Sequence, residues 1–203
     1  MGAGKSRAQN TAERQGEILA ATLALFAEGG LAGASITAIS ARSGASVGSI
    51  YHHFGDREGV LYALYRQCFA ACFAELKQAV LAESAARSGI IALVDTYLSW
   101  IEAQPDCGRF MYEASGGDLL ANHRAEVAAF KAAFYADIMG WLAPHVAAGA
   151  IIALPPWAYD VIVMGPAHEF ARRWLAGLRE MPMTEARAVI GAAIWRAVQP
   201  QKD

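Results

Sequence analysis

The sequence predicts an all-α protein with two domains, residues 1–56 and residues 57–203. Apolar residues recur every three or four positions along most of the chain, which is the spacing of one face of an α-helix. Glycine or proline pairs interrupt this pattern at Gly29–Gly30, Gly116–Gly117 and Pro155–Pro156 and divide it into separate helices. Because 55% of the residues are hydrophobic and 18% are charged, the composition is that of a folded chain with a substantial core.

The first helix is expected to begin near Asn10, with Glu13 at the capping-box position, and to end at Gly29–Gly30. The side of this helix that is expected to be buried contains Ile18, Ala21, Thr22, Leu25 and Phe26. The polar segment before it lacks the apolar stretch of a secretory signal.

Two short helices joined by a tight turn are expected next. Ser35 is a good N-cap residue for a helix that carries Ile36 and Ile39 on its apolar side. Gly44 then ends this helix, and Ser46 is placed to cap the following one. This pattern predicts a helix-turn-helix, the motif that places its second helix in the major groove of DNA.

The second of these helices has an apolar side and a slim polar side. Four residues at positions i, i+3, i+4 and i+7 are expected to form one buried stripe: Val47, Ile50, Tyr51 and Phe54. Three small or polar residues are expected to face outward: Gly48, Ser49 and His52. Hydroxyl and imidazole groups can hydrogen-bond to base edges or phosphates, so this side is suited to DNA recognition.

The segment from Ile18 to Leu64 resembles the amino-terminal domain of the tetracycline-repressor (TetR) family of transcription regulators. The family's Gly-x-aliphatic-Tyr-x-His-Phe pattern is matched by Gly48-Ser49-Ile50-Tyr51-His52-His53-Phe54. Arg57 stands where the family usually has lysine, and Ser40 and Ser43 stand where it more often has alanine. The resemblance implies a homodimer that binds a near-palindromic DNA operator and is released from it by a small effector.

Carried over by position, the resemblance implies two groups of DNA-binding residues. Phosphate contacts are expected from Ser35, Thr37, Ser46, Tyr51, His53 and Arg57. The residues expected nearest the bases are Gly48, Ser49 and His52. Periodicity leaves Tyr51 ambiguous, because its ring belongs to the apolar stripe while its hydroxyl can extend to a phosphate.

Further helices are expected beyond residue 56. Asp56 is placed to cap a long helix that continues to about Glu83, and another is expected from Gly89 to Gln104. Three later helices are expected to begin near Asp118, at Pro155–Pro156 and after a cap at Thr184. The long helix starts beside the DNA-binding domain and ends in the second domain, so it can transmit a displacement between them.

In the resembled family, the central helices enclose an effector pocket and the last two helices form a dimer bundle. The residues expected to line the pocket are mostly aromatic: Trp100, Phe110, Glu113, His123, Phe130, Phe134 and His168. This composition is typical of a site for a small hydrophobic or aromatic compound, and also of an ordinary core. Residues suited to close packing in the dimer are Ile162, Gly165, Pro166, Val189, Ala193 and Ile194, with Glu169 and Arg172 at the rim.

Two other classes of protein stay open. The net charge is −2, and up to Val60 five basic residues balance five acidic ones, which leaves room for a helical ligand-binding or scaffold protein without DNA binding. An enzyme would need groups such as Cys107, Glu113, His123 and His168 to meet in space. No GxSxG, HExxH or complete P-loop motif accompanies them, so the chain is not expected to be an enzyme.

No cofactor or metal is expected, because Cys68 and Cys72 lie at positions i and i+4 without the further ligands of a zinc site. The three cysteines are expected to be reduced in a cytoplasmic protein. The most apolar run, residues 146–165, contains Pro155–Pro156 and Asp160, so no membrane span is expected. Repression relieved by an effector is the expected logic, with activation left open.

Overall fold

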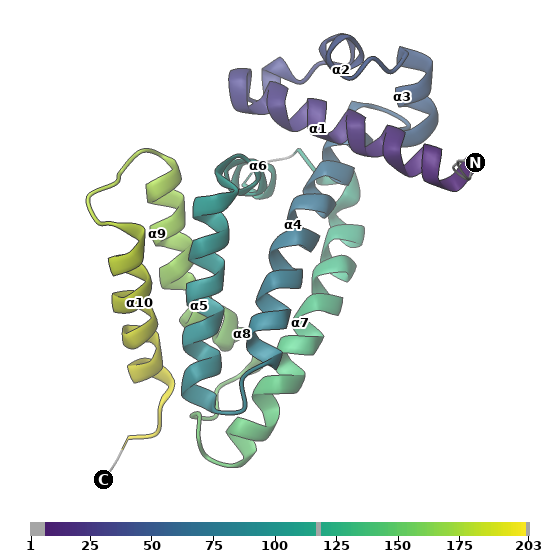
Figure 1. Cartoon of the computed structure of the whole chain (residues 1–203). Coiled ribbons are helices and arrows are strands. Elements are labelled where there is room, and N and C mark those ends of the chain that lie inside the picture. Colours follow the sequence, from purple (N-terminus) through teal and green to yellow (C-terminus); the bar gives the residue numbers. More distant parts are fainter. Residues whose placement is uncertain (1–6, 117–118, 202–203) are drawn as a thin grey trace, which may run out of the picture. The chain divides into compact units, whose positions relative to one another are not determined.

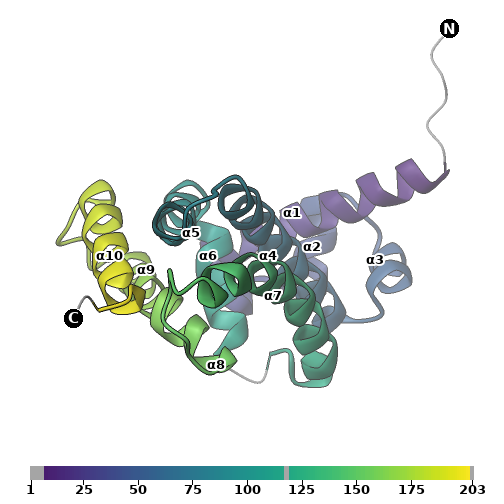
Figure 2. The ribbon, with the colours of Figure 1, turned by 90° about the horizontal axis from the view of Figure 1, so that it is seen from below.

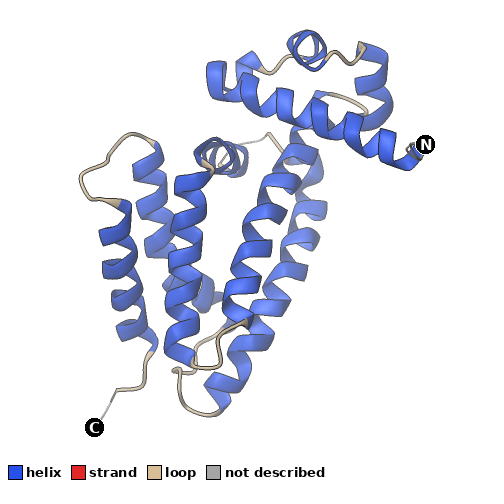
Figure 3. Ribbon diagram, in the orientation of Figure 1, coloured by secondary structure: helices blue, strands red, loops and turns tan. Residues whose placement is uncertain are grey.

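The computed structural model describes residues 7–116 and 119–201, and every regular element in these residues is a helix (Figures 1 and 3). The all-α prediction is therefore confirmed. In chain order the elements are α1 (Arg7–Gly33), α2 (Ile36–Ser43), α3 (Val47–Phe54), α4 (Arg57–Leu81), α5 (Ala86–Ala103), α6 (Pro105–Ser115), the 3-10 turn η1 (Ala121–His123), α7 (Arg124–Ala147), α8 (Pro156–Tyr159), the π-helical segment η2 (Asp160–Met164), α9 (Gly165–Leu175) and α10 (Met183–Val198).

The chain forms two compact units. The first contains the residues up to Cys68 together with Phe110–Arg124, and the second contains Phe69–Arg109 and the residues from Ala125 onward. Helix α4 is continuous across the boundary at Cys68. The predicted domain boundary after residue 56 stays a prediction, because α4 belongs to both units and the chain has no break at their boundary.

The core of the first unit draws on α1, α2, α3, the first turns of α4 and the end of α6. Its deeply buried side chains include Ile18, Phe26, Ile39, Ile50, Leu61, Leu64, Tyr65 and Phe110. The ring of Phe110 meets that of Phe26 edge-on, with the ring centroids 5.1 Å apart. The buried hydroxyl of Thr22 donates a 2.8 Å hydrogen bond to the carbonyl of Ile18, so its burial leaves no polar atom unsatisfied.

Helix α1 confirms its predicted end and corrects its predicted start. Gly29 and Gly30 leave helical geometry, and Gly30 has a φ of 62°, a left-handed value that favours glycine. The helix begins at Arg7, so Asn10 lies inside it and is not its cap. Among the described helices, Ala8–Gly33 is long and apolar enough to cross a membrane by length and composition alone, whereas the sequence analysis expected no such segment. Residues of this helix such as Ile18 are buried in the core of the first unit.

In the second unit, α10 lies along α5, and α9 packs against both (Figures 1 and 2). Arg187 of α10 forms an ion pair with Asp95 of α5 at 3.5 Å and donates to the hydroxyl of Ser99. Helices α4 and α7 meet through an aromatic cluster whose neighbouring ring centroids are 4.3–5.8 Å apart, made of Phe69, Phe73, Phe130, Phe134 and Tyr135. An ion pair of 2.6 Å between Lys77 and Asp137 also joins these two helices.

Two predicted helix starts in the second unit are wrong by one turn or less. Helix α5 begins at Ala86 and not at Gly89. Helix α10 begins at Met183, so Thr184 lies inside the helix and is not its cap. The reason is Pro182, which has extended backbone angles of φ −58° and ψ 141° and takes the N-cap position.

The helix predicted at Pro155–Pro156 is confirmed, since α8 begins at Pro156. It then widens into the π-helical segment η2 before α9 continues the chain. Asp118, the predicted start of an earlier helix, lies outside the described residues, and the helix that follows it, α7, begins at Arg124.

Candidate nucleic-acid interface

The turn between α2 and α3 is fixed by the predicted caps. The hydroxyl oxygen of Ser35 accepts a 3.2 Å hydrogen bond from the backbone N–H of Ala38, and that of Ser46 accepts one of 3.1 Å from Ser49. Gly44 ends α2 in the left-handed region with a φ of 68°. A residue with a Cβ would be strained there, so the sequence dictates the helix-turn-helix locally.

Ser40 and Ser43 strengthen this turn. The Ser40 hydroxyl donates to the carbonyl of Ala45 at 2.7 Å, and the Ser43 oxygen accepts from the N–H of Ala45 at 3.2 Å. Alanine, which the TetR family more often has at these positions, makes neither bond. The two departures from the family pattern therefore add polar contacts that tie the turn at Ala45 to the end of α2.

The apolar side of α3 is narrower than predicted. Ile50 is fully buried and Phe54 is half-buried, but Val47 and Tyr51 are 42% and 48% exposed. The prediction that all four residues form one buried stripe is wrong for Val47 and Tyr51. Because α3 has only eight residues and packs on α2, its buried contact is centred on Ile50.

Eight of the nine predicted DNA-binding residues lie on α2, on α3 or at their N-caps. Exposed residues among them are Ser35, Thr37, Ser46, Gly48, Tyr51 and His52, while Ser49 and His53 are half-buried. The rings of His52 and His53 lie edge to face with centroids 5.2 Å apart. The helix-turn-helix thus presents hydroxyl, phenol and imidazole groups to solvent.

The fold itself gives no reason for glycine at position 48. A Cβ built on Gly48 would meet nothing nearer than the Ser46 hydroxyl oxygen, at 4.0 Å, which is ordinary van der Waals contact. Gly48 is not among the glycines with positive φ, so its backbone is also open to other residues. Glycine inside a helix costs about 0.5–1 kcal/mol relative to alanine.

The guanidinium of Arg57 donates hydrogen bonds within the protein. Its Nε donates a 2.8 Å hydrogen bond to the carbonyl of Ala34, and its terminal nitrogen donates to the carbonyl of Leu31. These carbonyls follow the bend of α1, so Arg57 holds the connection between α1 and α2. Asp56 beside it caps α4 as predicted, accepting a 2.7 Å bond from the N–H of Gly59. Arg57 thus ties the start of α4 to the segment that joins α1 and α2, and its phosphate contact stays a prediction.

Two other arginines of the first unit are held by carboxylates. Arg42 makes a two-bond contact with Glu28, at 3.0 and 2.7 Å, and Arg14 pairs with Glu17 at 2.8 Å. The hydrogen bond to Arg42 lowers the pKa of Glu28 and raises the pKa of Arg42. Exposed pairs of this kind add little stability, but they explain how acidic and basic residues balance in this region.

Three of the seven predicted effector-binding residues, Phe110, Glu113 and His123, belong to the first unit. Phe110 is fully buried in that unit's core. His123 stacks on Tyr62, with ring centroids 4.2 Å apart and nearly parallel planes, and Glu113 is exposed. Their role in effector binding stays a prediction.

The other four predicted effector-binding residues lie in the second unit. Phe130 and Phe134 belong to the aromatic cluster between α4 and α7, and Trp100 of α5 is 3% exposed. His168 of α9 meets the ring of Tyr97 edge-on at 4.9 Å. Burial lowers the pKa of His168, partly offset by the charge of Asp160.

Sequence reasoning missed Val47 as an exposed residue and missed Phe69 and Phe73 as partners in the aromatic cluster. The sequence contains features that indicate the exposure of Val47 and the pairing of Phe69 with Phe73. Val47 directly follows the cap Ser46, at the end of a short helix where a neighbouring helix covers least. Phe69 and Phe73 lie at positions i and i+4, so they share one face of α4.

A comparison with known proteins finds a family that part of the first unit resembles. Residues 18–64 match the model of bacterial regulatory proteins of the tetR family. This segment, called the TetR domain after the model that it matches, includes α2, α3 and their caps, together with most of α1 and the start of α4.

Similar proteins extend the comparison beyond the TetR domain. The repressor KstR2 of Rhodococcus jostii is 30% identical over 111 residues, 55% of this chain and 54% of that protein, so the chain spans about half the length of this relative. A TetR family transcription regulator from Marinobacter aquaeolei has a similar fold, with a TM-score of 0.80 at 18% identity over 96% of this chain and 100% of that one. FadR of Bacillus subtilis, in complex with stearoyl-CoA, has a TM-score of 0.74 at 15% identity, covering 88% and 96%. The matched model is described as one of regulatory proteins, KstR2 as a repressor and the Marinobacter protein as a transcription regulator.

Proposed function

We propose that this chain is a cytoplasmic, homodimeric transcription repressor that binds a near-palindromic DNA operator through α3 and is released by a small hydrophobic or aromatic effector. The observation that carries the DNA-binding part is Gly48. A helical glycine costs stability, and neither packing nor backbone geometry requires one at this position. Close approach of the helix to a partner accounts for it, and the partner of a helix-turn-helix is the major groove.

Neutral donors carry the proposed phosphate contacts. The hydroxyls of Ser35, Thr37, Ser46 and Tyr51 are on exposed residues at the start of α2 and on or next to α3. Hydroxyls and helix N-termini are common phosphate ligands. His53 completes this group, whereas Arg57 acts by holding the motif in shape.

Base contacts are assigned to Gly48, Ser49 and His52. Gly48 lets the backbone come near the base edges, and the Ser49 hydroxyl and the His52 imidazole can hydrogen-bond to them. Loss of such a group should change which sequence is preferred, whereas loss of a phosphate ligand should weaken binding to all sequences.

Two copies of the chain are needed to read a near-palindromic site. Recognition helices must lie roughly 34–36 Å apart to enter successive major grooves. The proposed dimer contact uses exposed residues of α9 and α10, namely Pro166, Val189 and Ala193. Ile194 is buried within its own unit and is not part of this contact.

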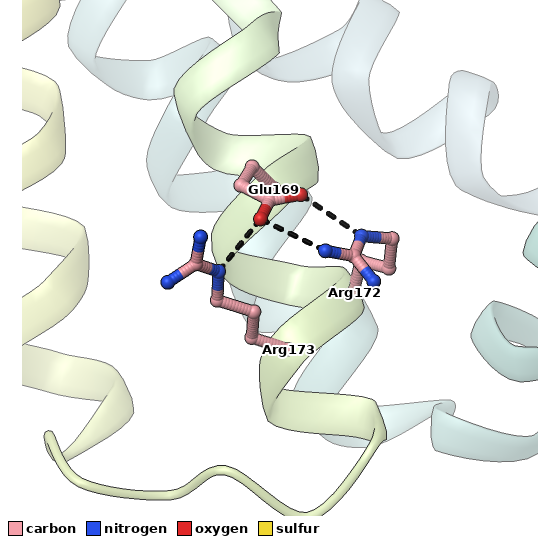
Figure 4. A network of polar contacts seen from close by, with 3 residues as sticks. All are labelled: Glu169, Arg172 and Arg173. Atoms are coloured by element: carbon pink, nitrogen blue, oxygen red, sulfur yellow. Dashed lines mark hydrogen bonds and ion pairs between the residues drawn. The ribbon is translucent and has the colours of Figure 1, made fainter.

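A charged network lies on α9, next to the proposed contact (Figure 4). Glu169 accepts two hydrogen bonds of 2.9 Å from Arg172 and one of 2.6 Å from Arg173. These bonds lower the pKa of Glu169 to about 2, so the network keeps its charges at neutral pH. With one carboxylate and two guanidinium groups the network is positively charged overall, so we place it at the solvated rim of the proposed contact.

The proposed effector site is the aromatic region of the second unit. It includes four residues that the sequence indicates, Trp100, Phe130, Phe134 and His168, together with Phe69. Rings supply apolar contact, and His168 and Tyr97 supply polar groups. FadR carries stearoyl-CoA in a similar fold, so long-chain acyl compounds belong in a first screen. Effector binding would displace α4, which continues into the TetR domain, and a coupling of about 1–3 kcal/mol is the usual size.

The test is enrichment of a DNA duplex from a random pool by the purified protein, followed by binding titrations at two salt concentrations. The proposal predicts a two-part, near-palindromic sequence bound by one dimer, with a weaker dependence on salt than contacts from lysine or arginine would give. An effector screen by thermal shift then identifies compounds that stabilise the protein and release the duplex. The competing hypothesis, a helical ligand-binding protein without DNA binding, is favoured by the balanced charge of the first unit and predicts ligand stabilisation with no enriched sequence.

A further inference from the structure

We infer that Val47 reads the methyl group of a thymine in each operator half-site; this inference rests on the proposed DNA-binding function. Val47 is the first residue of α3, directly after the cap Ser46, and 42% of its surface is exposed. The N-terminal residues of a recognition helix are the ones that meet base edges. Val47 therefore lies where base contacts are made.

The chemistry of Val47 selects one target. Its side chain has only methyl groups, which cannot hydrogen-bond to a base. In the major groove, the apolar group presented by an unmodified base pair is the C5 methyl of thymine. A valine at this position consequently favours thymine over cytosine, adenine and guanine, and the same edge without the methyl group gives it nothing to contact.

The neighbours of Val47 support a close contact. Gly48 follows it and has no side chain to hold the helix away from the base pairs. Tyr51 lies one turn further along the same side of α3 and is 48% exposed, so its hydroxyl can contact a phosphate while Val47 contacts the base. The β-branched side chain of valine is stiff at χ1, so ordering it on DNA loses little conformational entropy.

The size of the effect follows from the area of one methyl group. Removing a buried methyl-sized group from such a contact should weaken binding about fourfold in one half-site. A symmetric operator changed in both half-sites should lose roughly fifteenfold.

The experiment replaces each thymine of the enriched duplex, one at a time, by deoxyuridine, which lacks only the C5 methyl group. Binding is measured by fluorescence anisotropy for the parent protein, Val47→Ala and Val47→Ser. One thymine per half-site should show the fourfold loss with the parent, a smaller loss with Val47→Ala, which keeps one methyl group, and no loss with Val47→Ser, which keeps none. Val161→Ala changes an exposed valine of the second unit and serves as the matched control, which should respond to deoxyuridine like the parent.

Thermal unfolding shows whether the variants fold, and the exposure of Val47 predicts melting temperatures close to that of the parent. The inference is overturned if no thymine shows the loss, or if Val47→Ser loses as much affinity on the same replacement as the parent does. Failure to enrich any duplex would overturn the proposed function and this inference together. Enrichment without a methyl effect would overturn the inference alone.

Discussion

Gly48→Ala adds one methyl group to the exposed side of α3, at a place where the nearest protein atom would be 4.0 Å away. Within the protein this change removes the conformational freedom of glycine and meets no obstacle. It should raise the free energy of unfolding by about 0.5–1 kcal/mol and the melting temperature by about 1–4 °C. The variant is thus expected to be more stable than the parent.

On DNA the same methyl group should be harmful. If the helix backbone at Gly48 lies against the base edges, the added group overpacks that contact, and overpacking typically costs about 1–3 kcal/mol. The corresponding loss of affinity is roughly 5-fold to 150-fold for each half-site. Alanine at position 48 is therefore expected to make the protein more stable and to weaken its binding to DNA.

Gly140→Ala provides a matched control. Gly140 is an exposed glycine inside α7, and a Cβ placed on it would have no protein atom within 4 Å. It should gain similar stability without any change in operator binding. Melting temperatures from differential scanning fluorimetry and dissociation constants from anisotropy titrations give the two readouts for both variants.

Two results would refute the reasoning, each at a different step. If Gly48→Ala is less stable than the parent, the fold itself needs glycine and the inference to an outside partner fails. If it gains stability but binds the enriched duplex as tightly as the parent does, the glycine is not retained for contact with DNA.

Arg57→Ala should lower the free energy of unfolding by about 2 kcal/mol, because the carbonyls of Ala34 and Leu31 lose their charged donor. Urea unfolding measures this loss of stability. If Arg57 acts only by holding the fold, the salt dependence of DNA binding should be the same for the variant and the parent. If Arg57 contacts a phosphate instead, stability should be unchanged and the salt slope should be lower by about one. Ser46→Ala should lower the free energy of unfolding by about 1 kcal/mol through loss of the α3 cap, whereas Ser46→Thr should keep most of the cap's contribution. Equal urea midpoints for the two variants would contradict the role of Ser46 as a cap. Burial lowers the pKa of His168 below its usual 6.5, while the charge of Asp160 raises this pKa, that of Lys131 lowers it, and the ring of Tyr97 packs against the imidazole. As the pH falls below 6.5, the unfolded chain therefore takes up a proton before the folded chain does, and the free energy of unfolding decreases. Urea titrations at several pH values between 5 and 8 should show a weaker pH dependence for His168→Gln, and identical profiles would count against this cause.

The parts of the fold that depend on local chemistry follow from the sequence. Ser35, Ser46 and Asp56 cap their helices as predicted, because a cap needs only a side-chain oxygen and a backbone N–H two or three residues later. Gly44 adopts the left-handed conformation for an equally local reason. The position of the helix-turn-helix is therefore predictable from a single sequence.

The errors arise where distant segments decide the outcome. Helical spacing places Val47 and Tyr51 on the same side as Ile50, but the width of the buried stripe depends on how much of α3 its neighbour covers. Phe110 packs beside Phe26, a residue far from it in the sequence, and no spacing rule indicates this contact. Arg57 likewise finds its partners, the carbonyls of Leu31 and Ala34, at the end of α1 and just after it.

The participation of Phe110 in the first unit has a practical consequence for protein engineering. A fragment ending at residue 56 would lack Leu61, Leu64 and Tyr65 as well as Phe110, all of which are almost fully buried in that unit. Expressed alone, or grafted as a cassette onto another sensor, such a fragment would expose the apolar surface that these side chains cover. A chimera that exchanges DNA specificity should instead transplant individual exposed positions of α3 and keep the recipient's own helices beneath them.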